Sequence, residues 1–127
     1  MIALTDTHAL RWWLDGSNRL PARARNVFDN KMDSVVVSTV VPWELAIKTN
    51  IGKLRVEPLL ASWAHMLETQ GFTELHIDSK HAIRAGLLPL HHRDPFDRML
   101  VAQAQATGWP IISGDPVFDH YGVRRIW

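Results

Sequence analysis

The chain has 127 residues, of which 46% are hydrophobic and 21% charged, and it contains no cysteine. This length fits one domain, and the lack of cysteine excludes a disulfide framework and thiolate chemistry. Fourteen Lys and Arg against thirteen Asp and Glu give a formal net charge of +1, which excludes binding of nucleic acid by bulk positive charge alone. Apolar runs are too short to span a membrane and no signal peptide is visible, so we expect a cytoplasmic protein without a membrane partner.

Short apolar runs alternate with helical patterns along the chain. In chain order the patterns predict a strand over 2–5, a helix from Asp6 to Gly16, a helix over 22–28, a strand over 34–38, a helix over 39–50, a helix over 58–69, a strand over 73–77, a helix over 79–87, a helix from Asp94 to Gly108, and strands over 110–113 and 124–127. The three valines at 35–37 are typical of a strand buried on both faces. We therefore expect an α/β fold in one domain, 1–127, with a mostly parallel sheet of four or five strands flanked by helices.

Four carboxylates are expected near the carboxyl ends of these strands, where parallel α/β sheets bind ligands. Asp6 closes the first strand, and Asp115 follows the strand over 110–113. Glu44 lies early in the helix after the second strand, and Asp97 lies in the first turn of the helix that opens at Asp94. Helix capping alone explains most such acids, but Glu44 lies beyond the cap position among apolar neighbours, where an unpaired charge is costly.

Taken together, these four carboxylates predict a metal site. Their formal charge of −4 in one cleft must be relieved by protonation or by a cation. Because every candidate ligand is a hard oxygen, with neither Cys nor an obvious His partner, Mg²⁺ or Mn²⁺ is favoured over Zn²⁺.

The motifs resemble those of PIN-domain ribonucleases, and in particular the VapC toxins of type II toxin–antitoxin modules. The residues that carry the resemblance are Asp6-Thr7-His8, Trp43-Glu44-Leu45-Ala46 with Lys48, Asp94-Pro95-Phe96-Asp97-Arg98 leading into residues 100–104, and Ser113-Gly114-Asp115 with Phe118. The resemblance spans essentially the whole chain, and the family often has Thr where this chain has Ser113.

The resemblance implies a Mg²⁺- or Mn²⁺-dependent endoribonuclease. In it the catalytic and metal-binding acids are Asp6, Glu44, Asp97 and Asp115, with Glu44 either a ligand or the base that orients the attacking water. Asp94 is expected to cap its helix and to touch metal at most through water. The implied partners are an RNA substrate such as a tRNA, a VapB-like antitoxin and a second copy of the chain in a homodimer.

Several cations are candidates for contact with the RNA backbone. Arg98 directly follows Asp97 and is the first choice, and Arg93, Lys48 and Arg11 lie near the same acids in sequence. Ser113 is expected to fix an acid or a water. The adjacent His91 and His92 are expected in a loop or on RNA rather than on zinc, because no tetrahedral N/S spacing accompanies them.

The sequence leaves the roles of two tryptophans and the choice among several functions undecided. Trp12 and Trp13 are adjacent on a helix and point about 100° apart, so only one can be central to a core face and the other is a candidate for an interface. The alternatives to a ribonuclease are a PIN-like nuclease or Mg²⁺ phosphohydrolase on another substrate, a Mg²⁺-binding receiver-like signalling domain, and a non-catalytic interaction module. A receiver would have adjacent acids after its first strand, where this chain has only Asp6.

Overall fold

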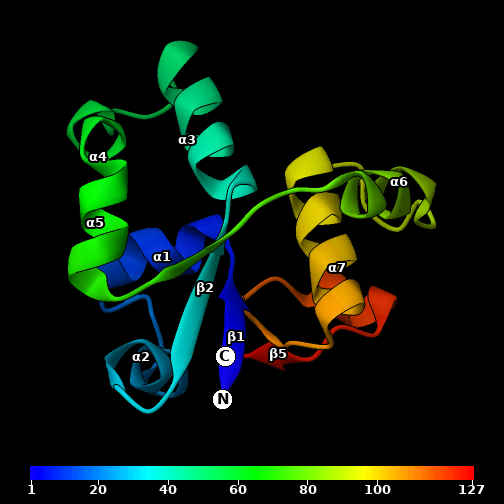
Figure 1. Cartoon of the computed structure of the whole chain (residues 1–127), viewed down its shortest axis with the longest axis horizontal. Helices are drawn as coiled ribbons and strands as arrows, with labels where there is room; N and C mark the ends of the chain where they lie inside the picture. The colour runs from blue at the N-terminus through cyan, green and yellow to red at the C-terminus, as the bar shows by residue number, and fades with distance from the viewer.

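Five parallel strands form one sheet in the computed structural model, which describes residues 1–127 (Figure 1). The strands are β1 (Ile2–Thr5), β2 (Ser34–Ser38), β3 (Thr73–Leu75), β4 (Ile111–Ile112) and β5 (Arg125–Ile126). Their order across the sheet is β3-β2-β1-β4-β5, and every neighbouring pair is parallel. The predicted α/β fold with a mostly parallel sheet is thereby confirmed.

Helices cover the sheet on both sides. They are α1 (Thr7–Leu14), α2 (Ala22–Asp29), α3 (Val40–Asn50), α4 (Glu57–Ala61), α5 (Trp63–Gln70), α6 (Ser79–Leu87), α7 (Pro95–Thr107) and the 3₁₀ helix η1 (Pro116–Tyr121). In Figure 1, α1, α2 and α5 lie to the left of β1 and β2, and α6 and α7 lie to the right. None of the helices has the length and apolar character needed to cross a membrane.

The core lies between the sheet and these helices. Val35, Val36 and Val37 of β2 are all buried, as expected for a strand covered on both faces. Ile111 and Ile112 of β4 are fully buried, so even a two-residue strand contributes to the core.

Two elements differ from the sequence prediction. The single helix expected over 58–69 is divided at Ser62 into α4 and α5. The Ser62 hydroxyl donates to the Pro58 carbonyl oxygen at 2.9 Å, a contact between a serine and the carbonyl four residues earlier that bends helices. The helix η1 was not predicted, because six residues closed by Gly122 give too little periodicity to recognise.

The strand order places a switch point at β1. The chain moves from β1 to β2 and β3 on one side and then returns to put β4 on the other side. Thr5 pairs with Ile112, so the carboxyl ends of β1 and β4 are neighbours. Asp6 and Asp115 follow these two ends, and ligands of open α/β sheets bind in this position.

Candidate functional site

Asp6 lies at the centre of the site, directly after β1. Its side chain caps α1, because Oδ1 accepts a hydrogen bond from the Ala9 amide at 2.8 Å. The residue is only 7% exposed. Burial raises the pKa of the Asp6 carboxyl above its usual range, although hydrogen bonds from Ser113 and the Ala9 amide lower it. Asp6 is therefore both a helix cap and a poorly solvated carboxylate, so the two interpretations of the sequence do not exclude one another.

Glu44, on α3, is buried, and both of its carboxylate oxygens accept hydrogen bonds. The Thr7 hydroxyl donates to Oε1 of Glu44 at 2.6 Å, and the Lys48 ammonium, one turn along α3, donates to Oε2. These contacts offset the cost of burying its charge. Thr7 was not identified from the sequence as a site residue. Its position directly after Asp6 could have indicated this role. One short segment then supplies both the Asp6 carboxylate and the hydroxyl that orients the carboxylate of Glu44.

Asp97 lies in the first turn of α7, which Asp94 caps as predicted. Oδ1 of Asp94 accepts hydrogen bonds from the amides of Phe96 at 2.8 Å and of Asp97 at 3.3 Å. The imidazole Nε2 of His92 lies 2.8 Å from Oδ2 of Asp97. Burial raises the pKa of Asp97 to about 6; the hydrogen bond from His92 opposes this rise, and the nearby charges of Asp94 and Asp6 add to it.

The tightest group of possible metal ligands differs from the predicted set. His92, Asp94 and Asp97 each offer one ligand atom, and these atoms lie within 4.8 Å of one another; no other group of three does so. No pattern in the sequence indicated that His92 would contact an acid. Asp6 is close enough to raise the pKa of Asp97, and Glu44 acts on Asp6 in the same way. Asp6 therefore interacts electrostatically with both Glu44 on α3 and Asp97 on α7.

Asp115 completes the site on the β4 side. Its Oδ1 accepts a hydrogen bond from the Val117 amide at 2.9 Å and so caps η1. The fully buried Ser113 hydroxyl accepts from the Asp115 amide at 3.0 Å, which fixes the turn that carries this acid. Asp115 and Asp6 line the same pocket, which has a volume of about 400 Å³.

Arg98 has a different role from the expected RNA contact. It is 8% exposed, and its guanidinium donates to the backbone carbonyls of five residues. These acceptors are Ala85 (2.9 Å), Gly86 (3.4 Å), Leu88 (2.9 Å), Pro89 (3.1 Å) and His92 (3.2 Å). Arg98 thus joins the end of α6 and the following loop to α7, and it holds the segment that places His92 beside Asp97.

The other predicted cations are distributed more widely. Lys48 is half-buried and paired with Glu44. Arg93 is exposed in the loop before α7. Arg11 lines a separate pocket of about 270 Å³ together with Arg55. Of the four predicted cations, only Arg93 is therefore exposed, and it directly precedes Asp94 in the chain.

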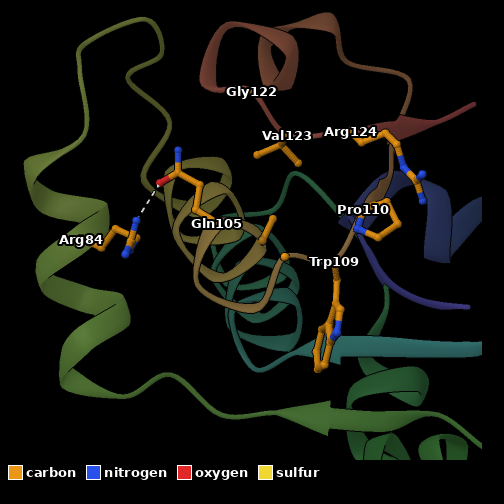
Figure 2. A pocket seen from close by; sticks show the side chains of 9 residues that line it. Arg84, Gln105, Trp109, Pro110, Gly122, Val123 and Arg124 are labelled. Carbon is orange, nitrogen blue, oxygen red and sulfur yellow. Dashed lines mark hydrogen bonds between the residues drawn. The ribbon is translucent and has the colours of Figure 1, made fainter.

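The largest pocket lies away from the carboxylates. It has a volume of about 680 Å³, and its lining runs from the end of α7 to Pro110, at the amino end of β4 (Figure 2). Arg84 and Arg124 contribute to the lining, with Arg84 donating to Gln105 at 3.3 Å. No carboxylate lines this pocket, so it cannot serve as a metal centre of the predicted kind.

The chemistry of the carboxylate site fits a divalent cation. No lysine or arginine forms an ion pair with Asp6, Asp94, Asp97 or Asp115. Asp6 and Asp97 are poorly solvated, and such carboxylates either take up protons or bind a cation; carboxylate oxygens suit Mg²⁺ or Mn²⁺.

Comparison with known proteins identifies the class to which this fold and site belong. The family model described as PIN domain matches residues 3–123, so the chain belongs to the PIN-domain family. The expected membership of this family is confirmed. No match was found among curated proteins.

Several solved structures share the fold. One is FitAB bound to the IR36 DNA fragment, with a TM-score of 0.71 and 16% identity over 99% of this chain and 94% of that one. VapBC2 from Rickettsia felis, bound to a promoter DNA fragment, gives 0.68 and 15% over 98% and 97% of the two chains. FitAcB from Neisseria gonorrhoeae gives 0.68 and 18% over 100% and 97%. At these identities the similarity concerns the fold alone.

Proposed function

We propose that the chain is a Mg²⁺- or Mn²⁺-dependent endoribonuclease and the toxin of a VapBC-like type II toxin–antitoxin module. One observation carries the proposal: two poorly solvated carboxylates, Asp6 and Asp97, have no lysine or arginine partner and lie near the switch point of a PIN domain that fills residues 3–123. Membership of the PIN family also favours a nuclease over the receiver-like alternative. The structures of VapBC2 and FitAB support assignment to a toxin–antitoxin module.

The chain's own residues divide the work of phosphodiester hydrolysis. Asp6, Asp97 and Asp115 are the acids that would hold one or two cations, directly or through water, with Asp94 beside Asp97. When bound, a divalent cation lowers the pKa of a water molecule and neutralises charge on the phosphate. Glu44 is fixed by two donors and is the group that orients the attacking water.

His92 and Ser113 act on the acids rather than on the substrate. The contact of His92 with Oδ2 sets the rotamer of Asp97, and Ser113 fixes the turn at Asp115. This use of neighbouring hydrogen bonds to orient ligands is general in metal sites. Arg93, which is exposed and directly precedes Asp94 in the chain, is the cation we assign to the RNA backbone.

The proposed setting is the cytoplasm, with a tRNA or another RNA as substrate. A VapB-like antitoxin would hold the toxin inactive, and two copies of the chain would form a homodimer within a larger complex with the antitoxin.

Controlled expression in a bacterial host tests this function. Induction of the wild-type chain should stop growth and produce new RNA 5′ ends at a small set of sites. Asp6→Asn should do neither, because it removes one central carboxylate while keeping a hydrogen-bond acceptor for the Ala9 amide. Asp119→Asn is the matched control, since Asp119 is an exposed carboxylate outside the site that pairs with Arg125, and it should behave like the wild type. Growth arrest with unchanged RNA ends, or full activity of Asp6→Asn, would contradict the proposal.

A further inference from the structure

A pocket walled by aromatic rings adjoins two of the carboxylates. Its volume of about 400 Å³ falls within the roughly 300–1,000 Å³ typical of small-molecule sites. The lining residues are Asp6, His8, Trp12, Gly114, Asp115 and Trp127. Two of these are acids of the proposed active site, so whatever enters this pocket lies next to the carboxylates.

The rings form a continuous aromatic wall. His8 and Trp12, one turn apart on α1, have ring centroids 5.8 Å apart, and Trp12 lies 5.8 Å from Trp127 at an angle of 46°. Both tryptophans are half-buried, and neither indole N–H donates a hydrogen bond within the protein, whereas those of Trp13 and Trp63 do. The pocket therefore offers aromatic surface from two tryptophans whose indole N–H groups are not used within the protein.

The backbone at Gly114 is adapted to this wall. A Cβ atom at position 114 would lie 2.7 Å from Cε2 and 2.8 Å from Cζ2 of Trp127, which is closer than such atoms approach in proteins. Only glycine lets the indole of Trp127 lie against the segment that carries Asp115. Trp127, which follows β5, is thus held beside an acid that follows the neighbouring strand β4.

We propose that this pocket binds an unpaired nucleobase of the substrate, next to the phosphodiester at the carboxylates. Aromatic side chains stack on any base because every base has a π face, and bases are accessible to such stacking in single strands, loops and bulges rather than inside an A-form duplex. The inference rests on the proposed ribonuclease function and narrows its substrate to RNA that is unpaired at the cleaved bond. It also gives a role to Trp12, which the sequence left as a candidate for an interface while Trp13 packs on Phe28.

The test uses a single-stranded oligoribonucleotide in which one base at a time is replaced by an abasic site. With the wild-type chain, one abasic position beside the cleaved bond should lower kcat/KM by roughly 5- to 150-fold, the range expected for loss of one stacked base. Trp127→Ala should lower kcat/KM on the intact strand by a similar factor, and the abasic substitution should then have no further effect. Trp127→Phe should restore most of the activity, because it keeps a ring in the pocket. Trp109→Ala, which removes a half-buried tryptophan from the pocket of Figure 2, should leave cleavage unchanged.

Binding measurements separate this inference from the proposed function. In the Asp97→Asn background, the affinity for the labelled strand should fall on removal of the same base or of the Trp127 ring, and a duplex of the same sequence should bind more weakly. If the wild type cleaves no RNA, the ribonuclease proposal fails, and the binding measurements alone then show whether the pocket holds a base. Cleavage or binding that is indifferent to every abasic position would overturn the inference. The inference would also be overturned if the abasic site and Trp127→Ala lowered kcat/KM independently, so that their effects multiplied. It would be overturned as well if Trp127→Ala lost activity that Trp127→Phe did not restore.

Discussion

Replacing Asp97 by Asn should stabilise the metal-free protein while abolishing its activity. Burial raises the pKa of Asp97 to about 6, whereas the unfolded chain has the usual value of 3.8. The folded protein therefore holds this proton more tightly than the unfolded chain does. The resulting stability is fully present below about pH 3.8 and is lost as the pH rises through about 6. At neutral pH the folded state carries the cost of a poorly solvated charge.

The size of the effect follows from the difference between the two pKa values. A change from 3.8 to about 6 corresponds to about 3 kcal/mol in the free energy of unfolding. Asn has the shape of the neutral acid and can still form a hydrogen bond with His92. Asp97→Asn should thus be more stable than the wild type by about 3 kcal/mol at pH 7.5 and equally stable near pH 4.

Urea unfolding followed by tryptophan fluorescence, with EDTA present, measures this difference. The midpoint at pH 7.5 should rise by roughly 1–3 M urea, given the slopes usual for small domains. Asp119→Asn is the control, because the hydrogen bond from Arg125 lowers the pKa of this exposed carboxyl and removing it should bring no gain. A difference between Asp97→Asn and wild type that is the same at pH 4 and 7.5, or a variant that is less stable at pH 7.5, would refute the reasoning.

Three further predictions follow from the same contacts. Mg²⁺ or Mn²⁺ at about 100 times its Kd should stabilise the wild type at pH 7.5 by about 2.7 kcal/mol and have little effect on Asp97→Asn, as read from thermal unfolding; equal stabilisation of both would contradict the site. Arg98→Leu should cost about 3 kcal/mol or more, because five backbone carbonyls each lose a hydrogen bond and only that of Pro89 keeps a second side-chain donor, Tyr121; a stability within about 0.5 kcal/mol of wild type by urea titration would contradict that role. Thr7→Val should cost about 1.5–3 kcal/mol and lower kcat more than it raises KM, because Glu44 loses its fixed orientation; a pure KM effect would place Thr7 on the substrate instead.

The sheet was predictable because its three central strands, β2, β1 and β4, are short, mostly apolar and bounded by residues that stop them. The valines at 35–37 and the isoleucines at 111–112 could form little else, and the acids that follow strands identified the edge that holds the site. Capping contributed as well, since Asp6, Asp94 and Asp115 all cap the helices that begin after them. The boundary between α4 and α5 depended on one hydroxyl–carbonyl contact at Ser62, which periodicity does not reveal.

The errors at the site came from equating proximity in sequence with proximity in space. Arg98 follows Asp97 directly, but adjacent residues of a helix point about 100° apart, so if Asp97 faces the acids its neighbour faces away from them. It enters the space between α6 and α7 instead. His92 shows the reverse case, because it meets Asp97 only through the path of a loop that Arg98 and Tyr121 hold in place.

Cleavage by the purified chain tests the central claim most directly. We expect single-stranded RNA, but not DNA of the same sequence, to be cut when Mg²⁺ or Mn²⁺ is added, and we expect EDTA to stop the reaction. Asp6→Asn and Asp97→Asn should remain folded and inactive under the same conditions. Cleavage that persists in EDTA, or that survives either substitution at the wild-type rate, would contradict a ribonuclease built on these carboxylates.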